Sequence, residues 1–171
     1  MKAMKSRPRL IPVEVPWQIS PSVPNLRMSA SEMDSPTTVS VSCVFLDKPT
    51  ASVRIELVFR GTCRAEFSVS HSDKEVVREE EYDWSEVPNF GMQSLDVSDP
   101  FQVEWAKTGF CPDSGMYEVK ESCWVLDSPR VKNHKHFLIL GHDVYVQVLA
   151  ESWEWRLVPV PSATRATGDS D

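Results

Sequence analysis

Three of the four histidines of the chain, His134, His136 and His142, lie close together in the sequence. Imidazole nitrogens are common zinc ligands, and alternate residues of a strand share one face about 7 Å apart. Cys123 could add a thiolate if it faces the same sheet. Lys132 and Lys135, next to the first two histidines, would repel a cation. We therefore expect no metal and no cofactor, and keep a site of these four residues as the weaker alternative.

Cys111 is the one thiol expected at an exposed position, because it opens the turn-forming stretch Cys-Pro-Asp-Ser-Gly. A thiolate there could act as a nucleophile, with a nearby histidine as base and Asp143 to orient the imidazole. No local signature accompanies these residues, and the patterns GxSxG, CxxC, GxGxxG and GxxxxGK[ST] are absent from the sequence. Any two of the 25 acidic residues could form a glycosidase pair, which the sequence does not test.

Residues 71–99, the acidic insert, hold nine acidic and two basic residues, which gives a charge of −7. The whole chain has 25 acidic and 18 basic residues, so the remainder carries 16 of each and is neutral. Aromatic residues next to acids are a common composition for a surface that attracts and binds a cationic partner. The predicted contact residues are Glu79, Glu80, Glu81, Tyr82, Asp83 and Trp84. The alternative is a solvated acidic loop whose aromatic side chains pack onto the domain.

The overall composition excludes several function classes. A net charge of −7 disfavours nucleic acid and anionic membranes as partners, because both bind cationic surfaces. No apolar run approaches the ~18 residues of a membrane span. The N-terminus has basic residues but no apolar run after them, so we expect no secretory signal, a cytoplasmic location and reduced thiols.

Six of the thirteen prolines fall within residues 1–36. Proline has no amide donor and restricts the residue before it, so this segment is expected to be an extended arm without a helix or a central strand. Residues 159–171 are small and polar after Pro159 and Pro161, which predicts a disordered tail. The expected folded domain is 37–158, about the size needed for one modest core.

Within this domain the hydrophobic pattern has a period of two, which is typical of half-buried strands. The runs 37–46, 52–60 and 63–69 predict an antiparallel meander with a turn at 47–50, in which Cys43 and Cys63 face the core. Later β-rich runs are 101–106, 116–126 and 136–150, where the insert around Gly141 indicates a hairpin or a bulge. Evidence for a helix is limited to 72–85. We expect a mainly β fold, a single antiparallel sandwich or a partly open barrel.

Trp153 and Trp155 share one face of a final strand, with charged residues between them. They could belong to the core, or form an exposed aromatic stripe that binds a ligand such as a sugar. The stretch from Gly109 to Trp155 resembles a compact bacterial module, a resemblance that assigns no functional residue.

These observations predict a non-enzymatic protein-binding module, such as an immunity or antitoxin-like protein or an adaptor. It would engage a basic partner through the acidic insert. The alternative is a small metal- or Cys-dependent enzyme, or a ligand-binding β-sandwich, with its site around His134, His136, His142 and Cys111.

Overall fold

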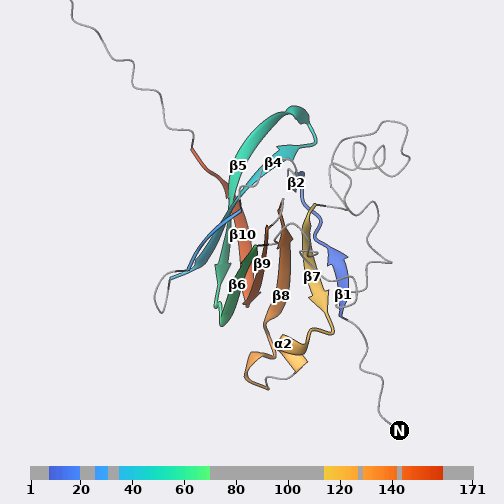
Figure 1. Ribbon diagram of the computed structural model, residues 1–171, viewed down its shortest axis with the longest axis vertical. Coiled ribbons are helices and arrows are strands. Elements are labelled where there is room, and N and C mark those ends of the chain that lie inside the picture. The colour runs from blue at the N-terminus through green and yellow to red at the C-terminus, as the bar shows by residue number, and fades with distance from the viewer. Residues whose placement is uncertain are drawn as a thin grey trace, which may run out of the picture.

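The computed structural model describes residues 8–19, 26–30, 35–69, 114–126, 129–141 and 144–159, and this part is mainly β (Figure 1). Its strands are β1 (Arg9–Pro12), β2 (Trp17–Ile19), β3 (Arg27–Ser29), β4 (Thr37–Phe45), β5 (Lys48–Arg60), β6 (Arg64–Val69), β7 (Met116–Lys120), β8 (Lys135–Leu140), β9 (Val144–Ala150) and β10 (Ser152–Leu157). The short helix α2 (Cys123–Leu126) and the 3-10 turn η1 (Pro129–Val131) lie between β7 and β8.

The strands form two antiparallel sheets, as expected from the alternating pattern. Sheet I has the order β1-β7-β8-β9-β6. Sheet II has the order β10-β5-β4-β2, and β3 pairs with the same strand, β4, as β2 does. Within the described residues each sheet has end strands on both sides, and no strand joins one sheet to the other by hydrogen bonds. The two sheets are therefore open.

One core lies between the sheets and is made of residues that alternate along each strand. Sheet II contributes Val39, Val41 and Cys43 from β4, and sheet I contributes residues such as Phe137. Phe59 and Phe137 meet across the core with their ring centroids 5.6 Å apart. Burying a side chain of this size contributes about 1.5–3 kcal/mol to the free energy of folding. Because every second residue of these strands is apolar, each sheet buries one face against the other, which produces the two layers.

Sheet I also buries part of its outer face. Leu10, Tyr117, Val119 and Leu138 form a second apolar cluster there, separate from the core between the sheets. Both faces of β8 are therefore buried, which explains why the run Phe137-Leu-Ile-Leu140 is apolar without alternation.

Residues 8–19 and 26–30, which the sequence places in an extended arm before the folded domain 37–158, pair with strands of the two sheets. β1 pairs with β7 in sheet I, and β2 and β3 pair with β4 in sheet II. Trp17 is fully buried in the core. The prolines permit this because β1 and β2 are end strands, where one side of the backbone needs no sheet partner.

The expected meander is correct for its first two strands and wrong for the third. β4 and β5 form a hairpin whose turn is Leu46–Asp47, shorter than predicted, so that Pro49 lies within β5. After Gly61, β6 leaves for sheet I and pairs with β9. Gly61 has a φ of 61° at this crossing, a left-handed backbone conformation that favours glycine.

The C-terminal half agrees with the predicted strands except in one place. β8 and β9 form the hairpin around Gly141, and β10 is the final strand. The run 116–126 is a strand only as far as Lys120 and then becomes α2. The expected strand at 101–106, the possible helix at 72–85 and the tail after Pro159 lie outside the described residues. No helix in the described part of the chain is long and apolar enough to cross a membrane.

Candidate functional site

The polar groups at one end of sheet I are organised by Ser122, which precedes α2. Glu121 follows the last residue of β7 and has a φ of 56°, the left-handed conformation of a turn. The Ser122 hydroxyl oxygen accepts a hydrogen bond from the Trp124 backbone N–H at 3.1 Å, as an N-cap does. This cap holds α2 against the outer face of sheet I.

His136 lies beneath α2, and both of its ring nitrogens are engaged. The Ser122 hydroxyl donates to Nδ1 at 2.6 Å, and Nε2–H donates to the Gln147 amide oxygen at 3.0 Å. The ring of Trp124 stacks on the imidazole with centroids 4.3 Å apart and planes 5° from parallel. The cross-strand register then places Leu149 of β9 beside His136, and Arg64 of β6 beside Leu149.

Arg64 completes this group, which we name the His136 cluster: Arg64, Ser122, Trp124, His136 and Gln147. The guanidinium carbon of Arg64 lies 3.8 Å from the centroid of the Trp124 ring, a cation–π contact. Arg64 also binds Glu66 through two nitrogens, at 2.9 and 2.5 Å. Four segments far apart in the sequence meet in this cluster.

The environment of His136 keeps the imidazole neutral. Burial lowers its pKa to about 4, the hydrogen bond with Gln147 opposes the change, and the charge of Arg64 adds to it. Only 3% of the residue is exposed. Because one nitrogen accepts from Ser122 and the other donates to Gln147, the neutral ring has a partner for each of its polar groups.

The pair Ser122–His136 has the distance of a nucleophile and its base, yet its surroundings favour a structural role. An imidazole with a pKa of about 4 is a weak base at neutral pH. Ser122 is 2% exposed, and its oxygen already accepts the Trp124 N–H. The hydroxyl is therefore committed to capping α2 and fixing the histidine tautomer.

His134 lies just before β8 and not on it, so the two histidines do not share a strand face as expected. Both line a small cavity of about 140 Å³ beside α2, together with Ser122. Nδ1 of His134 is buried there and has no hydrogen-bond partner among the described residues. Lys132 and Lys135 are exposed, and Lys135 Nζ lies 4.0 Å from the Glu118 carboxylate.

No group of three His, Cys, Asp or Glu side chains in the described residues is arranged to hold a metal. Cys123 is exposed at the start of α2. His142, Asp143 and Cys111 lie outside the described residues. Gly141, which precedes His142 in the sequence, comes five residues after His136. In extended chain, at 3.3 Å per residue, this places Gly141 about 16 Å from His136.

The other two thiols differ in their surroundings. Cys43 is fully buried in the core as predicted, and burial raises its pKa to about 12. The prediction that Cys63 faces the core is wrong, since it is exposed in the turn before β6. Burial of its sulfur and the charge of Glu151 raise the Cys63 pKa, while a backbone hydrogen bond lowers it.

Trp153 and Trp155 face the core side of sheet II, which favours the core interpretation over an exposed stripe. Trp155 contacts Trp17, with centroids 6.3 Å apart, and Phe45, at 5.6 Å. Trp153 contacts Phe137 at 6.2 Å. Both tryptophans stay partly exposed because β10 is an end strand of its sheet.

A second, larger cavity of about 410 Å³ lies beside the β5–β6 turn and is lined by Arg60, Gly61 and Thr62, with Ser35 and Pro36. Arg60 is the charged side chain among these lining residues, and it binds Glu154 at 2.7 Å. These side chains contain no nucleophile–base pair.

The predicted contact residues Glu79, Glu80, Glu81, Tyr82, Asp83 and Trp84 lie outside the described residues, so their role stays a prediction. The described residues locate the two ends of the segment that carries them. Val69 pairs with Val144, and Met116 pairs with Ile139, so both ends lie at the same end of sheet I. β8 and β9 lie between β7 and β6, so three inter-strand spacings of about 4.8 Å separate the two ends, about 14 Å in all.

Sequence reasoning missed four members of the His136 cluster: Ser122, Trp124, Gln147 and Arg64. A serine before the apolar run Cys-Trp-Val-Leu is a weak N-cap signal that could have indicated α2. Gln147 and Arg64 have no such signal, because only the pairing of β6, β9 and β8 brings them to His136.

Comparison of the chain with protein-family models, with curated proteins and with solved structures found no match.

Proposed function

We propose that this protein is a non-enzymatic protein-binding module, a β-sandwich that presents its acidic insert to a basic partner. The observation that carries the proposal is the position of Val69 and Ser114, which bound residues 70–113 at one end of sheet I. Backbone hydrogen bonds from both sheets hold the chain at Ser114 and Gly115, one from β2 of sheet II and one from β8 of sheet I. Ser114 O accepts from Ile19 N–H at 2.8 Å, and Gly115 O accepts from Leu140 N–H at 2.9 Å.

Loops at one end of a rigid β frame are a frequent place for recognition, because the sheets fix where the loop begins and ends. The insert carries a charge of −7, while the rest of the chain is neutral. Such a concentrated charge increases the association rate with a cationic surface and makes binding sensitive to salt. An immunity or antitoxin-like protein, or an adaptor subunit, would use an insert of this kind.

The described groups that could do chemistry support a binding role. His136 is a weak base in a fully hydrogen-bonded position, and Cys43 has a pKa of about 12. Ser122 caps a helix. In each case the side chain already has a structural function that accounts for its position.

The test replaces Glu79, Glu80, Glu81 and Asp83 by serine. A partner is first captured at low salt with the tagged full chain, identified by mass spectrometry and purified. Its affinity for both proteins is then titrated at several salt concentrations. We expect weaker binding and a shallower dependence on salt in the variant. Equal affinity and an equal salt slope would contradict the proposal.

A matched control removes four exposed acids from the described frame. The changes are Glu14→Ser, Asp47→Ser, Glu151→Ser and Glu121→Asn, the last because Glu121 has a φ of 56° that asparagine tolerates. The net charge changes equally in both variants. We expect this control to bind as the unmodified protein does, which separates the insert from a general effect of charge.

A further inference from the structure

The end strand β10 has one unpaired side among the described strands. It pairs with β5, and no other described strand pairs with its other side. Unpaired strand edges present backbone donors and acceptors that can add another strand.

The register shows which backbone groups of β10 point to that free side. Val158 N–H donates to Arg54 O at 3.0 Å, and the register pairs Arg156 with Glu56 and Glu154 with Val58. In an antiparallel ladder, hydrogen-bonded pairs alternate with pairs that are not hydrogen-bonded. The N–H and C=O groups of the even-numbered residues therefore face β5. Those of Trp153, Trp155 and Leu157 face the free side.

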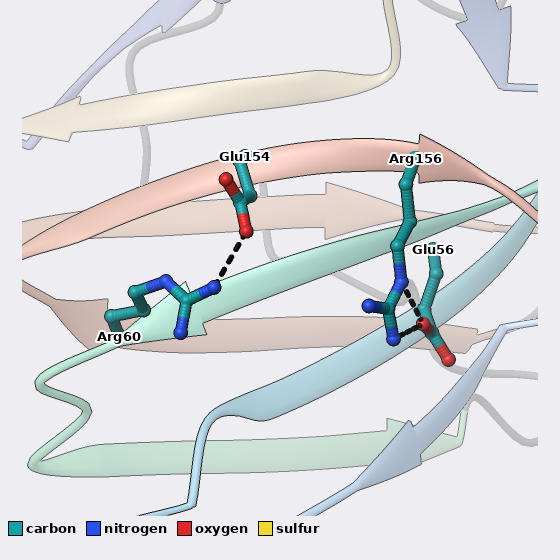
Figure 2. A network of polar contacts seen from close by, with 4 residues as sticks. All are labelled: Glu56, Arg60, Glu154 and Arg156. Atoms are coloured by element: carbon teal, nitrogen blue, oxygen red, sulfur yellow. Dashed lines mark hydrogen bonds and ion pairs between the residues drawn. The ribbon is translucent and has the colours of Figure 1, made fainter.

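The side chains of β10 carry opposite charges on the outer face of sheet II (Figure 2). Arg156 binds Glu56 through two nitrogens, at 2.7 and 2.5 Å, and Glu154 binds Arg60 at 2.7 Å. Glu154 and Arg156 nevertheless keep 58% and 65% of their side-chain surface exposed. Each can accept a further partner of opposite charge.

We propose that β10 pairs with β10 of a second copy of this chain, antiparallel, about a two-fold axis at Trp155. In this register the outward backbone groups of Trp155 bond to Trp155 of the other copy. Those of Trp153 bond to Leu157 of the other copy, and each pair exchanges two hydrogen bonds. Sheet II becomes continuous across the two copies.

Charge selects this register over its neighbours. Glu154 lies opposite Arg156 of the other copy, in a pair without backbone bonds, where side chains approach most closely. Each side of the axis then carries the alternating row Glu56–Arg156–Glu154–Arg60, the first two residues from one copy and the last two from the other. The next allowed register in one direction places Glu154 opposite Glu154, and in the other direction Arg156 opposite Arg156. Like charges directly opposite are unfavourable.

The apolar side of the strand is also complementary. Leu157 is 58% exposed, one of the few large apolar side chains that the described residues leave uncovered. The proposed register places it beside Trp153 of the other copy, which is partly buried. Pairing covers apolar surface on the core side and joins opposite charges on the outer side.

The test measures the molar mass of the full chain by sedimentation velocity over a concentration series, with two charge-reversal variants. Glu154→Arg places arginine opposite arginine, and Arg156→Glu places glutamate opposite glutamate. We expect a reversible dimer for the unmodified chain and at least about tenfold weaker association for each variant alone. An equal mixture of the two variants brings the introduced arginine opposite the introduced glutamate, and the retained Arg156 opposite the retained Glu154. The mixture should therefore regain the dimer.

The control is Glu66→Arg, the same charge change in an exposed ion pair on the end strand of sheet I. It should dimerise as the unmodified chain does. A monomer throughout the concentration series would overturn the proposal. So would a dimer that Glu154→Arg leaves intact, or a mixture of the two charge-reversal variants that stays monomeric. Recovery in the mixture also excludes misfolding as the cause of weaker association.

Discussion

Trp124 and His136 stack nearly in parallel, with ring centroids 4.3 Å apart and an angle of 5° between their planes. Trp124 belongs to α2 and His136 to β8, so this contact attaches the helix to the outer face of sheet I. The indole covers the imidazole on one side while Ser122 and Gln147 bind its nitrogens. A titratable group is thereby converted into a neutral part of the structure.

Removing the indole should change the proton affinity of His136. We expect Trp124→Leu to raise the His136 pKa from about 4 toward its usual range, because water then reaches the ring and stabilises the charged form. Trp124→Phe keeps an aromatic plate and should raise the pKa less. The measurement is an NMR titration of the His136 ring protons, and equal pKa values in all three proteins would contradict the expectation.

The free energy of unfolding should depend on pH between about 4 and 6.5. The His136 pKa is about 4 in the folded protein against 6.5 for an ordinary histidine. The unfolded chain binds more protons in this window, so stability falls as the pH is lowered through it, by roughly 3 kcal/mol from this residue. Urea unfolding at a series of pH values measures the slope.

The variant His136→Gln isolates this contribution, since glutamine does not titrate. We expect its stability at neutral pH to be lower and its slope between pH 6.5 and 4 to be shallower than that of the unmodified protein. An unchanged slope would assign the pH dependence to other groups.

Ser122→Ala should destabilise the protein by about 1–3 kcal/mol, because it removes the cap of α2 and leaves Nδ1 of the buried His136 without its donor. Ser52→Ala, at an exposed position of β5, is the control and should change stability by less than about 0.5 kcal/mol. Chemical denaturation of both variants supplies the comparison. Similar losses in the two would show that the Ser122 hydroxyl has no special role.

The thiols should differ in reactivity with a disulfide reagent. In a Cys111→Ser background, Cys63 and Cys123 are exposed and should react in the folded protein. Cys43 is fully buried with a pKa of about 12, so it should react only after unfolding. Mass spectrometry of the labelled protein identifies the modified residues, and early labelling of Cys43 would contradict its place in the core.

The strands were the most predictable part of the fold. In β4 and β5 every second residue is apolar, because one face meets the core and the other meets water, and this pattern is local. The destination of β6 was not predictable from its own residues. Its alternation suits either sheet, and Gly61 allows the chain to cross from one to the other.

The prolines near the N-terminus illustrate a similar limit. They correctly predict extended chain, since proline excludes a helix interior and a central strand. They do not show that β1 and β2 serve as end strands of two different sheets. That assignment depends on Leu10 and Trp17, which are buried by parts of the chain far away in sequence.

The sequence alone determined the mainly β character, the two β-rich runs on either side of Gly141, the core position of Cys43 and the concentration of charge between residues 71 and 99. Each depends on residue type and local spacing, which no distant contact alters. Only the tertiary structure decided that His136 is a neutral, stacked residue, because its partners come from β6, β9 and α2. The chemistry of a side chain depends on its neighbours in space, and the pairing of distant strands chooses them.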